Sequence, residues 1–266
     1  MIRANCLSIF ANKKPIIGVI HLLPLPGSPK FSGNIDAIIE LAEREAKTLN
    51  EAKVDGLIIE NYNDEPFTLS EPSSEQLALM ASIITIVGRQ ITIPIGVNVH
   101  FNAWRAEIAL AFACQAQFAR IEVFVDTVVT AAGIVQPCSA EITRYRKEIG
   151  ASGVALWADL HPKFSRNMLN TSLAESARMA KICLADAVIV TGQATGLATP
   201  LKDVQAVKEV IDLPVLVGSG ATVKNIQSVL ETASGVIVGS AFKESGYVYN
   251  EVSPAAVKAF LKAAGR

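Results

Sequence analysis

The 266-residue chain is poor in cysteine, histidine and aromatic residues, and it carries almost no net charge. Its four cysteines lie far apart and form no CxxC pair, so reduced thiols are the simplest expectation. The formal net charge is −1 and there is no basic run, which argues against a nucleic-acid partner. No uninterrupted apolar run reaches the roughly 18 residues that cross a bilayer, so no membrane span is expected. The apolar patch at 7–11 is too short for a signal-peptide core, so we expect a cytoplasmic protein.

What the chain has instead is aliphatic residues, in short runs that alternate with helical patterns. Half of its residues are hydrophobic, which suits parallel strands that are buried on both faces. Its length fits one (β/α)8 barrel, usually about 250 residues, although length alone also allows two small domains. We identify eight strand candidates: Ile16–Ile20, Gly56–Ile59, Pro94–Val97, Ala119–Val123, Val154–Ala158, Ala187–Val190, Pro214–Val217 and Val236–Val238.

Helical segments separate these strands, and no linker interrupts the alternation. A capping box formed by Ser73 and Gln76 predicts one helix start, and Thr222 is placed as the N-cap of another. The helical segments are 35–49, 73–87, 103–116, 139–149, 173–184, the stretch after Thr199-Pro200, 222–230, and the stretch after Ser253-Pro254. The order predicts α/β class: a single (β/α)8 TIM barrel domain over residues 1–266. A doubly wound open sheet is the alternative, and residues 124–137 are not assigned to any element.

Two glycine-containing turns follow the last two strand candidates, at the positions where many (β/α)8 barrels hold a phosphate. Glycine lets the backbone approach a ligand closely, and free N–H groups at a helix start attract an anion. We therefore predict a phosphorylated small-molecule ligand held by loops after strands seven and eight, with Thr191 and Gly192 of the sixth strand's turn nearby. The predicted phosphate-binding residues are Gly218, Ser219, Gly220, Gly239, Ser240, Thr191 and Gly192. The alternative is that these glycines only make tight turns.

Polar residues end several of the strand candidates, where the reactive groups of a (β/α)8 barrel lie. All three histidines of the chain fall on this rim. The predicted catalytic residues are Glu60, Asp159, His161, Lys163, His21 and Asn98.

The sharpest local signal is Asp159-Leu160-His161. Side chains two residues apart on a strand point the same way, so we expect Asp159 and His161 to face the barrel mouth together. The carboxylate would then orient the imidazole as a general base. A structural hydrogen-bonded pair is the alternative. Lys163 could neutralise an anion or form a Schiff base, or lie on the surface as a solvated charge. Lys243 could assist a phosphate or be another surface charge.

Glu60 and Glu122 could act as paired acids across the mouth, or as ion-pair partners of Arg120 or Arg105. A divalent metal site from His21, His100, His161 and Asp159 is allowed by ligand type, but no closely spaced motif supports it. No metal or other cofactor is therefore predicted.

Several segments together resemble the BtpA/SgcQ family. They are IGVIHLLPLPGSP at the first strand, DGLIIENYNDEPF at the second, and then ADAVIVTGQATG, PVLVGSGAT and GVIVGSAFK. The resemblance runs through most of the chain and implies a barrel of the ribulose-phosphate-binding class. The family takes its name from a member needed to accumulate photosystem I, while other members lie among sugar-metabolism genes.

The chain also departs from the family pattern. After the third strand the pattern N-V-L-R-N-D becomes Asn98-Val99-His100-Phe101-Asn102-Ala103, which lacks the arginine and the aspartate. The fourth strand has Arg120-Ile121-Glu122-Val123 where R-V-N-V is usual. The fifth has Ala158-Asp159-Leu160-His161-Pro162-Lys163-Phe164 for A-D-V-x-V-K-H. His21, Glu60, Asn61, Asn98, Asp159 and Lys163 keep matching places.

Three functional hypotheses follow. The first is a sugar-phosphate isomerase or an aldolase/lyase, with Asp159, His161 and Glu60 transferring protons. The second is a non-catalytic factor for photosystem I assembly, peripheral to thylakoid membranes, which the resemblance alone implies. The third is a barrel that has lost its chemistry. A homo-oligomer is expected, because barrel helices often bury apolar faces between subunits.

Overall fold

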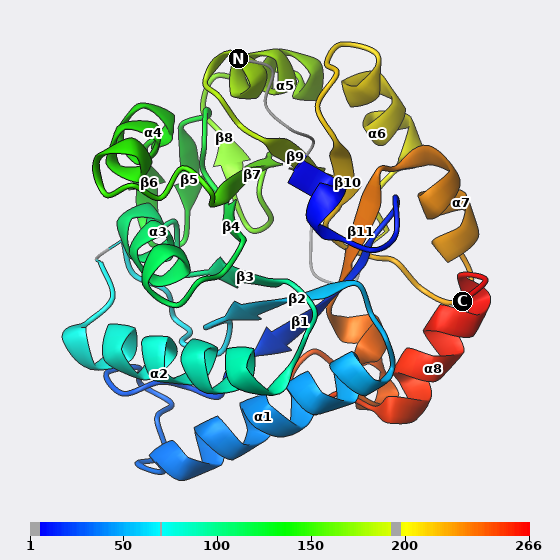
Figure 1. Cartoon of the computed structure of the whole chain (residues 1–266). Coiled ribbons are helices and arrows are strands. Elements are labelled where there is room, and N and C mark those ends of the chain that lie inside the picture. Colours follow the sequence, from blue (N-terminus) through cyan, green and yellow to red (C-terminus); the bar gives the residue numbers. More distant parts are fainter. Residues whose placement is uncertain (1–5, 70, 193–197) are drawn as a thin grey trace.

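The computed structural model describes residues 6–69, 71–192 and 198–266, and it shows the predicted closed parallel barrel (Figure 1). Eight strands close the barrel in the order β1-β11-β10-β9-β7-β4-β3-β2. Their bounds are β1 Ile16–His21, β2 Gly56–Glu60, β3 Ile95–Asn98, β4 Phe118–Ile121, β7 Ala155–Leu160, β9 Ala187–Val190, β10 Val215–Val217 and β11 Gly235–Val238. The barrel prediction is confirmed, and the strand boundaries differ from the predicted ones by at most two residues.

Helices surround the barrel and cover the outer faces of its strands (Figure 1). They are α1 Ile35–Glu51, α2 Ser74–Gln90, α3 Trp104–Ala113, α4 Ser139–Glu148, α5 Leu173–Ile182, α6 Leu201–Lys208, α7 Ile226–Thr232 and α8 Pro254–Ala263. Short 3-10 helices occur at η1 Cys6–Ile9, η2 Ser240–Phe242 and η3 Glu244–Gly246. In the described part of the chain, no helix is both long and apolar enough to cross a bilayer.

Two predicted helix starts can be compared with the structure. The capping box at the start of α2 is present, with Ser73 accepting from the Gln76 N–H and Gln76 accepting in return. The predicted start at Thr222 is wrong, because α7 begins at Ile226 after a turn. In that turn the Asn225 side chain accepts from the Thr222 N–H, so Thr222 does not cap the helix.

The unassigned stretch 124–137 forms a β-hairpin outside the barrel. Its strands are β5 Val128–Thr130 and β6 Gly133–Val135, and β8 Arg166–Asn167 pairs with β5 to give a three-stranded antiparallel sheet. Strand β8 belongs to the segment that follows β7. The small sheet therefore connects the loops after β4 and β7.

The N-terminal end of the barrel is closed by apolar side chains. Segment η1 lies across this end (Figure 1), where Leu7 and Phe10 belong to the interior cluster. The Phe118 and Trp157 rings stack inside the barrel with centroids 4.0 Å apart, and the Phe10 ring lies 5.9 Å from both. Because this end is filled and apolar, polar chemistry is confined to the opposite end.

Candidate functional site

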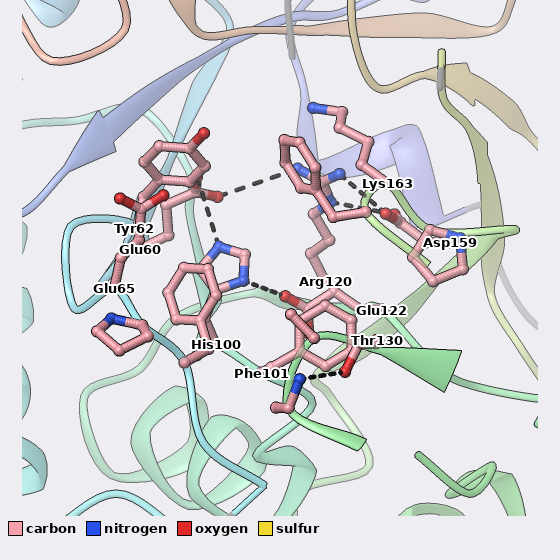
Figure 2. A pocket seen from close by; sticks show the side chains of 16 residues that line it. Glu60, Tyr62, Glu65, His100, Phe101, Arg120, Glu122, Thr130, Asp159 and Lys163 are labelled. Atoms are coloured by element: carbon pink, nitrogen blue, oxygen red, sulfur yellow. Dashed lines mark hydrogen bonds and ion pairs between the residues drawn. The ribbon is translucent and has the colours of Figure 1, made fainter. Parts of the chain in front are cut away.

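The polar end of the barrel follows from the alternation of side chains along each strand. Residues two apart face the same way, so the step from Phe118 leads to Arg120 and the step from Trp157 leads to Asp159. Both aromatic residues belong to the interior cluster, and both polar residues are buried. The ends of β1, β2 and β3 carry three further buried polar residues, His21, Glu60 and Asn98. One end of the barrel interior is thus lined by polar side chains (Figure 2).

Arg120 lies at the centre of this layer. Its Nε and Nη2 atoms donate to the two carboxylate oxygens of Asp159, at 3.0 and 2.9 Å. Its Nη1 atom is 4.0 Å from Glu60 Oε2. Burial raises the pKa of Asp159, and the guanidinium partly offsets that increase. Asp159 therefore orients the guanidinium, whose charge also faces Glu60.

Glu60 and Glu122 are connected through His100. Glu60 Oε1 lies 3.0 Å from His21 Nε2 and 3.8 Å from His100 Nε2, and His100 Nδ1 lies 2.5 Å from Glu122 Oε1. Burial opposes the charge on Glu60, but contacts with His100 and His21 outweigh it and hold its pKa well below the usual range. For His21, by contrast, burial is the dominant effect, and it lowers the pKa of the imidazole.

His100 behaves differently from His21, because a carboxylate lies on each side of its ring. Burial favours the neutral ring, yet the charges of Glu122 and Glu60 raise the pKa of His100 to about 10. A neutral imidazole and an imidazolium thus share the Glu60 carboxylate. Such carboxylate–imidazole pairs can accept and return a proton.

The raised pKa of His100 predicts a pH-dependent stability. The unperturbed pKa is 6.5, so the stabilising contribution is fully present below pH 6.5 and is lost as the pH rises through about 10. We expect the difference in unfolding free energy between the wild-type protein and His100→Gln to shrink as the pH rises over this range. Urea unfolding of both proteins at several pH values measures it. A constant difference would contradict a charged His100.

Among the described residues, Lys163 is the one cation of this region that makes no ion pair or hydrogen bond. Burial and the neighbouring Arg120 charge lower its pKa to about 8. Lys163 is therefore a half-buried residue of the cavity walls and not a fully solvated surface charge. Its ammonium group is available to an anion or a carbonyl group that enters the barrel mouth.

Two adjoining cavities open on this layer, and they share Glu60, Tyr62, Arg120 and Lys163. The larger has a volume of about 410 Å³, and loops after β2, β3, β4 and β7 form its walls. The smaller, about 40 Å³, lies against the predicted phosphate loops. Its walls include Gly218, Ser219, Gly220, Gly239 and Ser240.

The two glycine loops contain one glycine that close packing requires and several backbone N–H groups that could bind a ligand. A Cβ on Gly218 would lie 2.5 Å from Ile189 Cγ2, so packing against β9 already requires glycine there. A Cβ on Gly239 would be 3.2 Å from the His21 ring. Within the described residues, the N–H groups of Ser219, Gly220, Gly239 and Ser240 make no hydrogen bond. These donors lie in the loops that surround the smaller cavity.

The other predicted phosphate residues are already bonded to protein atoms. The Gly192 N–H donates to the Ser219 hydroxyl at 2.8 Å, and the Thr191 hydroxyl donates to the His161 carbonyl at 3.4 Å. Neither residue lines the smaller cavity. Gly192 and the Ser219 hydroxyl therefore hold the sixth- and seventh-strand loops together, which is a structural role that the sequence pattern did not reveal.

Comparison with known proteins identifies the family. The model of the BtpA family matches residues 12–266. The photosystem I biogenesis protein BtpA of Synechocystis sp. is 36% identical over 259 residues, covering 96% of this chain and 89% of that protein. The chain belongs to the BtpA family. An uncharacterized protein of Pyrococcus furiosus is also similar, 37% identical over 242 residues and 91% of both chains.

Solved structures share the fold of this BtpA-family barrel. A crystal structure of 3-hexulose-6-phosphate synthase matches with a TM-score of 0.58 and 19% identity, covering 94% of this chain and 99% of that one. At this identity the similarity establishes the barrel fold alone.

In this BtpA-family member, the predicted pairing of Asp159 with His161 is wrong. Strand β7 ends at Leu160, and His161 adopts a left-handed backbone with φ 52°, so the alternation of the strand stops before it. The His161 ring instead contacts Ser176 at 3.2 Å, with Asp126 4.0 Å away. His161 lines neither cavity, so the metal-ligand set that would have included it with Asp159 is not assembled.

Two predicted positions of positively charged residues also need correction. Lys243 is neither a phosphate ligand nor a surface charge: its side chain is 2% exposed and donates to both oxygens of Glu45 at 2.7 and 2.9 Å. Arg105 does not pair with the glutamates of the mouth, because its guanidinium lies 4.3 Å from the Tyr145 ring centroid. Arg120 is the arginine that faces Glu60.

Asn98 has a supporting role at the end of β3. It donates to the Arg120 carbonyl at 2.9 Å and to Glu107 Oε1 at 3.1 Å. Burial and the charge of Glu122 hold the pKa of Glu107 well above its usual range. Glu107 was not predicted, because it appears in the sequence as an ordinary helix residue of α3. Asn98 therefore holds β3, β4 and α3 in register below the cavity.

Several cavity residues were not predicted from the sequence. They come from loops rather than strand ends: Tyr62, Glu65, Pro66, Phe67, Phe101, Thr130, Ala131, Ala132, Pro162 and Phe164. Loop residues follow no periodic sequence pattern, so these residues can be assigned to the cavity only from the folded structure.

Proposed function

We propose that this protein binds a phosphorylated small molecule and transfers protons on it, as an isomerase or an aldolase/lyase. The observation that carries the proposal is the pair of adjoining cavities. One is bordered by backbone N–H groups that have no partner in the described part of the chain, the other by carboxylate–imidazole pairs. The two cavities share Glu60, Arg120 and Lys163. A phosphate in the smaller cavity would place the rest of a ligand against Glu60.

The charges support this assignment of roles. Backbone N–H groups and an unpaired ammonium are the usual partners of a phosphate. Lys163 and Arg120 line both cavities, so their charges face the anion from the side of the larger cavity. Charged His100 keeps the Glu60 carboxylate ionised, and the pair that Glu60 forms with neutral His21 is the group we assign to proton transfer. Asp159 is assigned to holding Arg120.

Thermal unfolding against a panel of sugar phosphates and inorganic phosphate tests the proposal. A ligand present at 100 times its dissociation constant should add about 2.7 kcal/mol to the unfolding free energy. Gly239→Val should remove this stabilisation, because a Cβ at Gly239 already reaches the His21 ring. Gly153→Val is the matched control, since a Cβ there meets nothing within 4 Å.

The second candidate function is a non-catalytic factor in photosystem I biogenesis. The observation that favours it is the 36% identity to the Synechocystis protein of that name. This function needs no phosphate site. If no phosphorylated compound changes the unfolding temperature, and Gly239→Val differs from the wild type no more than Gly153→Val does, the phosphate proposal is wrong and this second function is favoured.

A further inference from the structure

The larger cavity has a charged base and a large apolar side, which is more apolar surface than a bare sugar phosphate requires. Four aromatic residues line it, from three separate loops: Tyr62 and Phe67 after β2, Phe101 after β3, and Phe164 after β7. Prolines and alanines complete the apolar surface. Sugar hydroxyls could bond to the charged groups at the base of this cavity, such as Glu60 and Arg120, but hydroxyls placed against the aromatic side would lose hydrogen bonds to water without replacing them.

The aromatic rings form a continuous wall around His100. The Phe67 and His100 rings stack with centroids 4.8 Å apart and planes 27° apart, and the Tyr62 ring meets His100 edge-on at 5.9 Å. Phe101 follows, with its ring centroid 6.5 Å from that of His100. Figure 2 shows His100 between Glu60 and Glu122, so the rings that pack on His100 lie beside these acids.

Phe164 is a further apolar feature of the same cavity. It is 58% exposed, and its backbone has a left-handed φ of 58°. That conformation is rare for a bulky residue and is found where a structure holds a side chain in a required position. Because Phe164 lines the same cavity as Phe67 and Phe101, its exposed ring extends a contiguous apolar surface, and such surfaces mark ligand-binding grooves. Ala131 and Ala132 of the β5–β6 hairpin line this cavity too, and their small side chains leave room in it.

We propose that the ligand is a phosphate monoester that carries a flat aromatic or heteroaromatic ring. The ring packs in the larger cavity against Phe67 and Phe164, while the phosphate occupies the loops at Gly218–Gly220 and Gly239–Ser240. This inference rests on the proposed function, because it assumes the phosphate site. It adds the chemical class of the group attached to that phosphate. The volume of about 410 Å³ lies within the range of pockets that hold ring-containing small molecules.

Isothermal titration calorimetry with four probes tests the inference: inorganic phosphate, ribose 5-phosphate, phenyl phosphate and phenol. We expect phenyl phosphate to bind at least tenfold more tightly than ribose 5-phosphate and inorganic phosphate. Phenol, which has the ring without the phosphate, should bind most weakly.

Aromatic variants locate the ring. Phe67→Ala and Phe164→Ala should each weaken phenyl phosphate binding about tenfold and leave the affinity for inorganic phosphate unchanged. Phe112→Ala is the matched control, because Phe112 lies on α3, is 48% exposed and lines neither cavity. Phe164 is the more exposed of the two wall residues, so its replacement tests the inference even if Phe67→Ala fails to fold.

The outcomes separate the two proposals. If ribose 5-phosphate binds as tightly as phenyl phosphate, or the phenylalanine variants bind phenyl phosphate as the wild type does, the ring is not recognised and only the phosphate site remains. If phenol binds as tightly as phenyl phosphate, or no phosphate compound binds, the phosphate site and the proposed function fail as well.

Discussion

Replacing Lys243 with methionine should lower the unfolding free energy by about 3–5 kcal/mol, although Lys243 lines no described cavity. Lys243 and Glu45 are 2% and 3% exposed, and the ammonium donates to both carboxylate oxygens. Methionine fills a similar space but leaves the Glu45 carboxylate charged and buried. Of its hydrogen bonds to described residues, the one from the Val252 N–H then remains. This ion pair joins α1 to the segment after β11, so its loss loosens the closure of the barrel.

Urea unfolding at pH 7 measures the effect, and two further variants interpret it. Lys47→Met removes a lysine whose pair with Glu51 is 74% and 65% exposed, so it should cost less than about 0.5 kcal/mol. The double variant Lys243→Met/Glu45→Gln removes both charges and keeps an acceptor for Val252. It should recover more than half of the lost stability. A single variant as stable as Lys47→Met would show that the buried pair is not needed.

Replacing Arg120 with methionine should also cost about 3–5 kcal/mol at pH 7. The change removes the charge that is bidentate with Asp159 and 4.0 Å from Glu60 Oε2. Three buried carboxylates, those of Asp159, Glu60 and Glu122, would then face one another with less compensation. Arg120 lines both cavities, so the variant should bind phosphorylated ligands more weakly as well.

The pH dependence distinguishes this charge effect from a loss of packing. Without Arg120, the pKa of buried Asp159 rises further above its value in the unfolded chain. A carboxyl group whose pKa is higher in the folded than in the unfolded protein lowers the unfolding free energy at pH values above its unfolded pKa. This loss of stability disappears as the pH falls, because the group is then protonated in both the folded and the unfolded protein. The difference between the wild type and Arg120→Met should therefore shrink from pH 7 to pH 4. Lost packing would instead give a pH-independent difference.

A second arginine provides the matched control. Arg105 is exposed on α3 and lies over the Tyr145 ring at 4.3 Å from its centroid. Arg105→Met removes the same atoms from the surface and should cost no more than about 1 kcal/mol. If both arginine variants lose the same small amount, the buried layer is not held together by the Arg120 charge.

The fold of this protein could be predicted from the sequence because barrel strands are short and nearly all apolar. Runs such as Gly56–Ile59 and Val236–Val238 have no polar face, so only a sheet that is covered on both sides can contain them. Eight such runs separated by helical patterns leave few arrangements other than a closed barrel. The polar residues that end the strands, such as His21 and Glu60, could be assigned to the rim for the same reason.

The pairing of these residues could not be predicted, because it depends on distances across the barrel. Asp159 pairs with Arg120, which is 39 residues away in the chain, rather than with His161, which is two away. The sequence alone could not show that the strand ends at Leu160, one residue before His161. Sequence likewise gave no reason to bury Lys243, whose partner Glu45 is 198 residues distant.

The cavity walls were decided by tertiary structure alone. Loops after four different strands contribute Phe67, Phe101, Ala131 and Phe164, and no local pattern marks any of these positions. The sequence by itself determined the barrel and the polar end of its interior, because both follow from which residues must avoid water. Which acid meets which base, and which rings line the larger cavity, depended on closure of the barrel, which brought distant loops together.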